Sequence, residues 1–173
     1  MQNVPGPETD LQVTFTQLVE TYQKPLLNLC YMNLRDRTQA EDAVQEAFLR
    51  AWRALPSFRG ESSLKTWLMR IAVNVCRDMQ RSAWFRRLNR FITPDDLPER
   101  AGEEDPASGD LADAIGRLPA RLKEVVLLYY DQNLTMPEIA GVLGVNASTV
   151  SRRLKTACAR LRDALGEEAD IHG

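Results

Sequence analysis

The sequence predicts an all-α protein made of two small helical domains joined by a flexible acidic linker. Apolar residues recur at three- and four-residue steps through most of the chain, which is the period of an α-helix. Two of these periodic segments begin with a Thr-x-x-Glu capping pattern. Residues 91–110 instead combine prolines, glycines and acidic side chains without such a period. We therefore expect domains at residues 9–90 and 111–166, with the linker between them.

The composition places the chain among ordinary folded proteins. Hydrophobic residues make up 44% and charged residues 27% of its 173 residues, which are globular values. The polar, proline-containing N-terminus does not resemble a signal peptide, and no segment approaches the ~20 apolar residues of a membrane span. We expect a cytoplasmic protein that does not insert into a membrane.

The sequence contains no motif typical of an enzyme or a metalloprotein. Cys30, Cys76 and Cys158 stand far apart without a Cys-x-x-Cys pair, so we expect reduced, buried thiols, with a thiol switch as the alternative. Metal-ligand clusters, phosphate-binding loops and nucleophile arrangements are not found. We expect no catalytic residues, no metal and no cofactor.

The N-terminal domain is expected to contain three helices. The first follows the apolar repeat from Leu11 to Cys30, where Pro25 either starts a second helix or kinks the first. The next begins at a capping box of Thr38 and Glu41 and stops at Pro56. Its buried stripe should contain Ala43, Val44, Ala47, Phe48, Ala51, Trp52 and Leu55. A third helix after the loop at residues 58–63 should bury Leu64, Trp67, Leu68, Ile71, Ala72, Val75 and Met79.

Two faces of these helices carry candidate binding residues. The second helix presents Asp42, Gln45, Glu46, Leu49 and Arg53 opposite its buried stripe. A large apolar group is unusual on a solvated face, so a partner-binding face and a simply exposed leucine both remain open. The third helix presents Thr66, Arg70, Asn74, Arg77 and Arg81 at steps of three and four residues. This basic stripe can either bind DNA or be an ordinary face exposed to solvent.

Charge is segregated along the chain although the net charge is only −2. Residues 59–90 and 152–162 are strongly basic, and residues 95–113 between them are acidic. Separated basic blocks favour contact with nucleic acid, which the net charge alone would not suggest.

The C-terminal domain contains a helix-turn-helix pattern. Two helices are expected before this pattern, one at residues 111–118 and one that starts from Pro119. The apolar stripe of the second helix includes Leu122, Val125, Val126 and Tyr129. Thr135 and Glu138 then form a capping box, with Pro137 in the first turn. Ala140, Gly144 and Val150 stand where closely crossing helices need a small residue, a tight-turn residue and an apolar anchor.

The second helix of this pattern, from about Ala147, has the character of a recognition helix. It exposes Ser148, Thr149, Ser151, Arg152, Lys155 and Thr156, whereas Val150, Leu154, Ala157 and Leu161 face inward. Arginine and lysine near its start can reach guanine edges in the major groove, and hydroxyls can reach phosphates. The alternative is an ordinary helical hairpin with a solvated basic face.

Four segments in order resemble the bacterial RNA polymerase sigma factors of the extracytoplasmic-function (ECF) type. They read TQAEDAVQEAFLRAWRAL, FRGESSLKTWLMRIAVNVCRD, LPARLKEVVLLYY and LTMPEIAGVLGVNASTVSRRL. The resemblance extends from Phe15 to Leu165. It implies a sigma domain 2, a linker without a domain 3, and a sigma domain 4, bound to core RNA polymerase during promoter-specific initiation.

The resemblance also implies roles for particular residues. The face formed by Asp42, Gln45, Glu46, Leu49 and Arg53 would bind core polymerase. Recognition and opening of the promoter −10 element would involve Phe58, Arg59, Ser62, Ser63, Trp67, Arg70, Asn74, Arg77 and Arg81, although Trp67 can equally be a core residue. The −35 element would be read by Ser148, Thr149, Ser151, Arg152, Arg153 and Lys155. Of these, Arg152 and Lys155 would contact bases, and Thr149 and Arg153 would contact the DNA backbone.

The sequence departs from the common family pattern at two positions and leaves two other functions open. Pro137 stands where family members often have an acidic or polar residue, and Ser151 stands where they often have a basic one. Both departures affect which promoter sequence is recognised rather than the class of protein.

The resemblance also implies an anti-sigma factor as a partner, which for members of the family is often located in the membrane. The alternatives are a helix-turn-helix regulator that acts without polymerase and a sigma mimic that occupies an anti-sigma factor.

Overall fold

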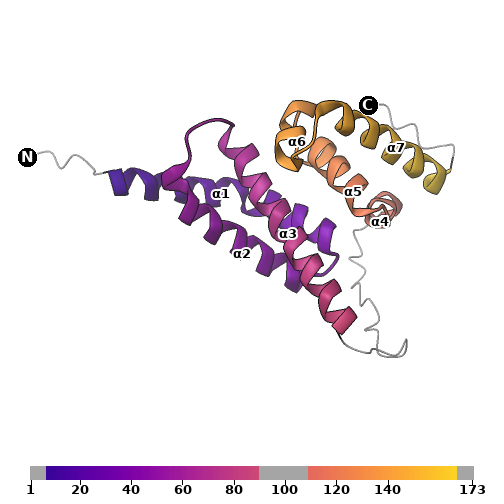
Figure 1. Cartoon of the computed structure of the whole chain (residues 1–173), viewed down its shortest axis with the longest axis horizontal. Helices are drawn as coiled ribbons and strands as arrows, with labels where there is room; N and C mark the ends of the chain where they lie inside the picture. Colours follow the sequence, from indigo (N-terminus) through magenta and orange to yellow (C-terminus); the bar gives the residue numbers. More distant parts are fainter. Residues whose placement is uncertain (1–6, 90–108, 167–173) are drawn as a thin grey trace, which may run out of the picture.

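The computed structural model describes residues 7–89 and 109–166, and every regular element in these ranges is a helix (Figure 1). The N-terminal domain consists of α1 (Pro7–Leu34), α2 (Arg37–Ala54), the short 3-10 helix η1 (Leu55–Ser57) and α3 (Leu64–Asn89). The C-terminal domain consists of α4 (Asp110–Gly116), α5 (Ala120–Val126), the π-helical turn η3 (Leu127–Asp131), α6 (Met136–Leu143) and α7 (Ala147–Leu165). The all-α, two-domain prediction is confirmed. The expected linker at 91–110 lies almost wholly outside the described residues.

Helix α1 is continuous through Pro25, so this proline does not start a second helix. The helix stops after Leu34, where Arg35 adopts a left-handed backbone with φ 55°. That conformation is uncommon for a residue other than glycine and ends the helical path. The chain then turns directly into α2.

The predicted capping box at Thr38 and Glu41 is wrong, because α2 starts earlier. Asp36 is the N-cap, with an extended backbone and a side chain that accepts a hydrogen bond from the amide of Gln39 at 2.9 Å. Aspartate is one of the most favourable N-cap residues, and Asp36 stands two positions before Thr38, so it caps the free amides of the first turn. Thr38 therefore lies inside the first turn, where Glu41 instead accepts a hydrogen bond from Arg37 at 3.1 Å.

Two further expectations for the N-terminal domain are corrected. Trp52 is 45% exposed rather than part of the buried stripe, and its ring makes an edge contact with Phe15 of α1, with centroids 5.0 Å apart. Thr66 is buried instead of exposed, and Ser63 accepts a hydrogen bond from its amide and donates one to its hydroxyl. In both cases the exposure depends on how neighbouring elements pack against the helix, which helical periodicity does not report.

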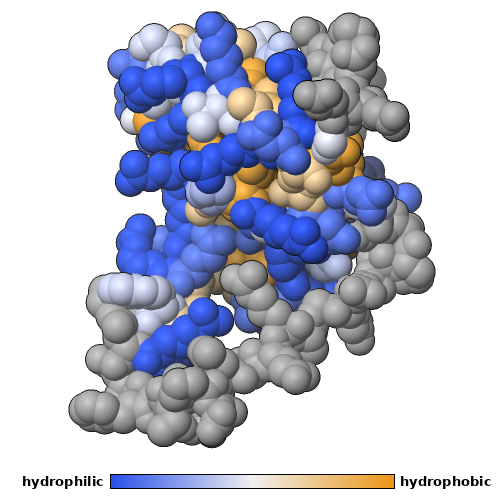
Figure 2. Space-filling view, turned by 90° about the vertical axis from the view of Figure 1, so that its right-hand side faces the viewer, coloured by the Kyte–Doolittle hydropathy of each residue, from blue (hydrophilic) through white to orange (hydrophobic). Residues whose placement is uncertain are grey.

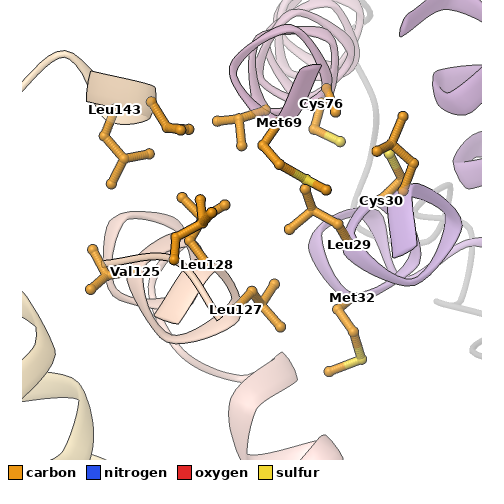
Figure 3. Close-up of a cluster of buried hydrophobic side chains, with 14 of the residues drawn as sticks. Leu29, Cys30, Met32, Met69, Cys76, Val125, Leu127, Leu128 and Leu143 are labelled. Carbon is orange, nitrogen blue, oxygen red and sulfur yellow. The ribbon is translucent and has the colours of Figure 1, made fainter. Parts of the chain in front are cut away.

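The two domains share one hydrophobic core. Its buried side chains include Leu29 and Met32 of α1, Met69 and Cys76 of α3, and Val125, Leu127, Leu128 and Leu143 of the C-terminal domain (Figure 3). Helix α6 packs on α3, and α4, α5 and η3 contact α1. The sequence predicts two domains but gives no sign that they dock.

No helix within the described ranges is long and apolar enough to cross a membrane.

Candidate nucleic-acid interface

The helix-turn-helix is built as the sequence predicts. The amide of Glu138 donates to Thr135 Oγ1 at 3.3 Å, and Glu138 Oε2 accepts from the amide of Thr135 at 2.7 Å. Gly144 ends α6 with φ 67° and ψ 35°, a left-handed conformation that glycine adopts without steric cost. Val150 is fully buried where α7 crosses α6. These contacts fix the angle at which α7 is presented.

The N-terminal half of α7 carries the six candidate −35 residues. Asn146 is the N-cap, and its side chain accepts hydrogen bonds from the Thr149 amide and the Ser148 hydroxyl, both at 2.8 Å. Ser148, Arg152 and Lys155 are exposed, and Thr149, Ser151 and Arg153 are half-buried. The predicted inward residues Val150, Leu154, Ala157 and Leu161 are all buried. Figure 2 shows the molecule from the side toward which the C-terminal end of α7 points in Figure 1, and hydrophilic side chains cover much of the surface seen there.

The basic stripe of α3 is only partly free. Arg70, Asn74 and Arg81 are exposed, and Arg81 lies 3.9 Å from Asp78. Arg77 instead forms a two-pronged ion pair with Glu124 of α5, through Nε to Oε1 at 2.9 Å and Nη2 to Oε2 at 2.8 Å. Hydrogen bonding to Glu124 raises the pKa of the Arg77 guanidinium above its usual value.

The loop before α3 adds aromatic surface next to that stripe. Phe58 and Trp67 pack with ring centroids 5.1 Å apart and planes tilted by 46°, and both rings are half-buried. Arg59, Ser62 and Ser63 are exposed beside them. Trp67 is thus neither a sealed core residue nor a fully exposed ring.

The exposed face of α2 combines charge with apolar surface. Asp42, Gln45, Leu49 and Arg53 are exposed, with Leu49 at 50%. Glu46 is less available, because Arg50 donates its Nε to Glu46 at 2.9 Å and its Nη1 to Asp78 of α3 at 2.9 Å. Leu49 and Trp52, three positions apart on α2, are both exposed large apolar side chains, and sequence analysis missed Trp52 because helical phase assigns it to the core.

Within residues 7–89 and 109–166, no group of three or more His, Cys, Asp or Glu side chains is arranged to hold a metal ion.

Comparison with known proteins matches both domains to one family. The Sigma-70 region 2 model matches residues 18–86, and the Sigma-70 region 4 model matches residues 114–163. The RNA polymerase sigma-H factor of Pseudomonas aeruginosa is 32% identical, over 87% of this chain and 86% of its own. The ECF RNA polymerase sigma factor SigW of Bacillus subtilis is 29% identical, over 89% and 90%.

A solved structure extends the similarity to three dimensions. The sigma factor RpoE of Bartonella quintana, in complex with the anti-sigma factor NepR, has a TM-score of 0.74 at 25% identity, covering 91% of this chain and 98% of that one.

Two helical domains that match Sigma-70 regions 2 and 4 place this chain in the class of transcription initiation factors. The chain belongs to the RNA polymerase sigma factor family, and within it to the ECF type. It is an alternative sigma factor that binds core RNA polymerase and promoter DNA and directs promoter-specific initiation. The comparisons do not favour the two alternative functions, a helix-turn-helix regulator that acts without polymerase and a sigma mimic that occupies an anti-sigma factor.

Proposed function

We propose that three separate faces divide the work of this factor. The α2 face, with Asp42, Gln45, Glu46, Leu49 and Arg53, binds core polymerase. The second face comprises the loop at 58–63 and the α3 stripe, and it binds and opens the −10 element. The third face is the N-terminal half of α7, which reads the −35 element. The observation that carries this assignment is that the three faces lie on three different helices, α2, α3 with its preceding loop, and α7, and that each keeps at least half of its candidates exposed.

The chemistry of each face supports its assignment. An exposed leucine amid charged residues suits a protein partner, because interface anchors are apolar and their rims polar. Arg70, Arg81 and Asn74 suit a DNA strand, with guanidinium groups on phosphates and an amide on an exposed base edge. Arg152 and Lys155 stand near the start of α7, where a recognition helix meets base edges.

We also propose domain boundaries, a location in the cell and a further partner for this chain. The domains span residues 9–90 and 111–166, with 91–110 as linker. The chain itself catalyses no reaction and acts in the cytoplasm, where the polymerase it recruits performs the chemistry. The whole-chain similarity to RpoE bound by NepR supports an anti-sigma factor as a further partner of this chain.

Reconstituted transcription tests the function. The purified chain is mixed with core polymerase and templates that carry matching −10 and −35 elements at several spacings. We expect comigration with core polymerase and transcripts only at one narrow range of spacing. A chain that binds the DNA without polymerase and supports no transcript would instead be a helix-turn-helix regulator. Templates with either element scrambled serve as controls.

A further inference from the structure

The C-terminal end of α3 carries a tryptophan that none of the three proposed faces uses. Trp84 is 57% exposed, which is the highest value among the large apolar side chains whose exposure the structure describes. The last turns of α3 are the lowest helical turns in Figure 1, beyond the other helices of the N-terminal domain. Single apolar side chains are common on protein surfaces, so the residues around Trp84 decide what it can bind.

The surroundings of Trp84 are strongly basic. Arg81, Arg86 and Arg87 are exposed on the same stretch of α3. Residues 79–89 contain no acidic side chain that would offset these charges. An exposed aromatic ring among arginines is the combination that nucleic-acid-binding surfaces use, because the arginines attract the phosphates and the ring supplies apolar contact. The charge at this end of α3 therefore favours DNA over a basic protein surface as the partner.

Trp84 lies on the same side of α3 as the proposed promoter stripe. At about 100° per residue, it stands about 60° from Arg81 and about 40° from Arg70 around the helix axis. It thus continues the stripe at the next step of three residues, and Arg87 follows three positions later. Arg86 is instead about 200° from Trp84, on the opposite side of the helix. The proposed DNA-binding face therefore extends beyond Arg81 toward the end of α3.

Helix geometry gives the distance between Trp84 and the opened bases. Asn74 is the residue proposed to hold a base of the −10 element, and Trp84 stands about 15 Å further along the axis of α3. The same length of duplex contains about four to five base pairs at about 3.4 Å each. With α3 lying along the DNA, Trp84 therefore faces DNA outside the opened segment.

The covalent reach of the chain indicates on which side of the −10 element this DNA lies. Residues 90–109 connect α3 to α4 and can span at most about 75 Å. The −35 and −10 elements lie about 25 base pairs apart, which is roughly 85 Å of duplex. Reversing α3 on the DNA would add much of its length of about 39 Å to that distance. We therefore place the C-terminal end of α3, with Trp84, on the upstream side, over the spacer between the elements.

We propose that Trp84 and Arg87 form a further DNA-contact site, which binds the duplex spacer about four to five base pairs upstream of the base held by Asn74. Paired bases are stacked and offer no free face, so the indole packs on the sugar-phosphate backbone and its N–H donates to a phosphate. Arg87 binds a neighbouring phosphate. Both contacts are independent of base sequence, and they hold the upstream duplex while the −10 element opens. This inference rests on the proposed function of α3 and adds a second DNA segment to it.

Two promoter fragments test the site in the complex of the full chain with core polymerase. Both carry a single-stranded −10 element, and neither carries a −35 element, so α7 contributes to the binding of neither. The long fragment keeps about ten base pairs of duplex upstream of the −10 element, roughly 34 Å, whereas the short fragment ends at that edge. Fluorescence anisotropy gives the affinity for each fragment over a range of salt concentrations.

The two residues should give different signatures. Trp84→Ala should weaken binding of the long fragment roughly five- to tenfold, whatever the spacer sequence, and leave the short fragment unaffected. Trp84→Phe keeps an apolar ring and should retain most of the affinity. Arg87→Ala should lower the salt-dependence slope for the long fragment by about one, because one phosphate contact is lost. Arg86→Ala, the matched control on the opposite side of α3, should leave the slope unchanged.

Three results would overturn the spacer contact. They are equal binding of the long fragment by Trp84→Ala and the unchanged chain, an equal loss on both fragments, and weaker binding of Trp84→Ala to core polymerase itself. Circular dichroism checks that each variant is folded. Asn74→Ala separates this inference from the proposed function, because it should weaken both fragments. No effect of Asn74→Ala on either fragment would count against the proposed function of α3, whereas an effect of Asn74→Ala without one of Trp84→Ala would overturn the spacer contact alone.

Discussion

Thr135 and Glu138 cap α6 reciprocally, each accepting a hydrogen bond from the backbone amide of the other. Removing the hydroxyl in Thr135→Ala leaves the Glu138 amide without its partner. We expect a loss of about 1 kcal/mol in the free energy of unfolding, measured by urea denaturation. Thr135→Ser keeps the oxygen and should be close to neutral. Equal losses in both variants would show that the threonine methyl group matters, not the cap.

Leu49 tests the α2 face. Its side chain is 50% exposed, so Leu49→Glu should leave the helical circular dichroism and the melting temperature nearly unchanged. Binding to core polymerase should weaken at least tenfold, as expected when an apolar anchor at an interface becomes charged. Leu111→Glu is the matched control, because Leu111 is a 49% exposed leucine of α4 outside the proposed faces. Unfolding of Leu49→Glu would return this side chain to the core.

Arg152 tests the reading of the −35 element. Arg152→Ala should reduce discrimination between matching and altered −35 sequences by about 1–3 kcal/mol if the guanidinium contacts a base. The measurement is a set of binding curves on single-base variants of the element. Arg160→Ala, an exposed arginine two turns further along α7, should leave discrimination unchanged. A uniform loss on all sequences would make Arg152 a phosphate contact.

Asn74 tests promoter opening. Asn74→Ala should slow or reduce opening by about 1–3 kcal/mol, because an exposed base would lose its amide partner, while −35 binding is preserved. Permanganate reactivity of unpaired thymines in the −10 element reports opening directly. Gln23→Ala removes an exposed amide of α1 and should have no effect. Unchanged reactivity in Asn74→Ala would remove Asn74 from the opening device.

The cysteines differ in accessibility. Cys30 and Cys76 are buried, whereas Cys158 is half-buried on α7. The interaction with the Cys30 sulfur, followed by burial, raises the pKa of the Cys76 thiol, so the reactive thiolate is suppressed at neutral pH. Alkylation of the folded chain, followed by mass spectrometry, should modify Cys158 alone, and all three cysteines should react in urea. Rapid modification of Cys76 in the folded chain would support a thiol switch.

Local signals in the sequence predict much of the fold. The start of α6, the turn at Gly144 and the inward face of α7 agree with the structure, because each depends on residues within a few positions of one another. Errors arise where a local signal has a competitor. Asp36 takes the N-cap role expected of Thr38, and Phe15 covers a Trp52 that remains exposed on its other side.

The sequence by itself determined an all-helical chain with a helix-turn-helix, a basic stripe on one helix and an apolar residue on an otherwise polar face. These are properties of helical period, capping and charge, which act over a few residues. Only the tertiary structure decided that Arg77 is paired, since its partner Glu124 lies 47 positions away. The docking of the two domains depends on complementary shape and charge between distant helices, and no local pattern encodes that match.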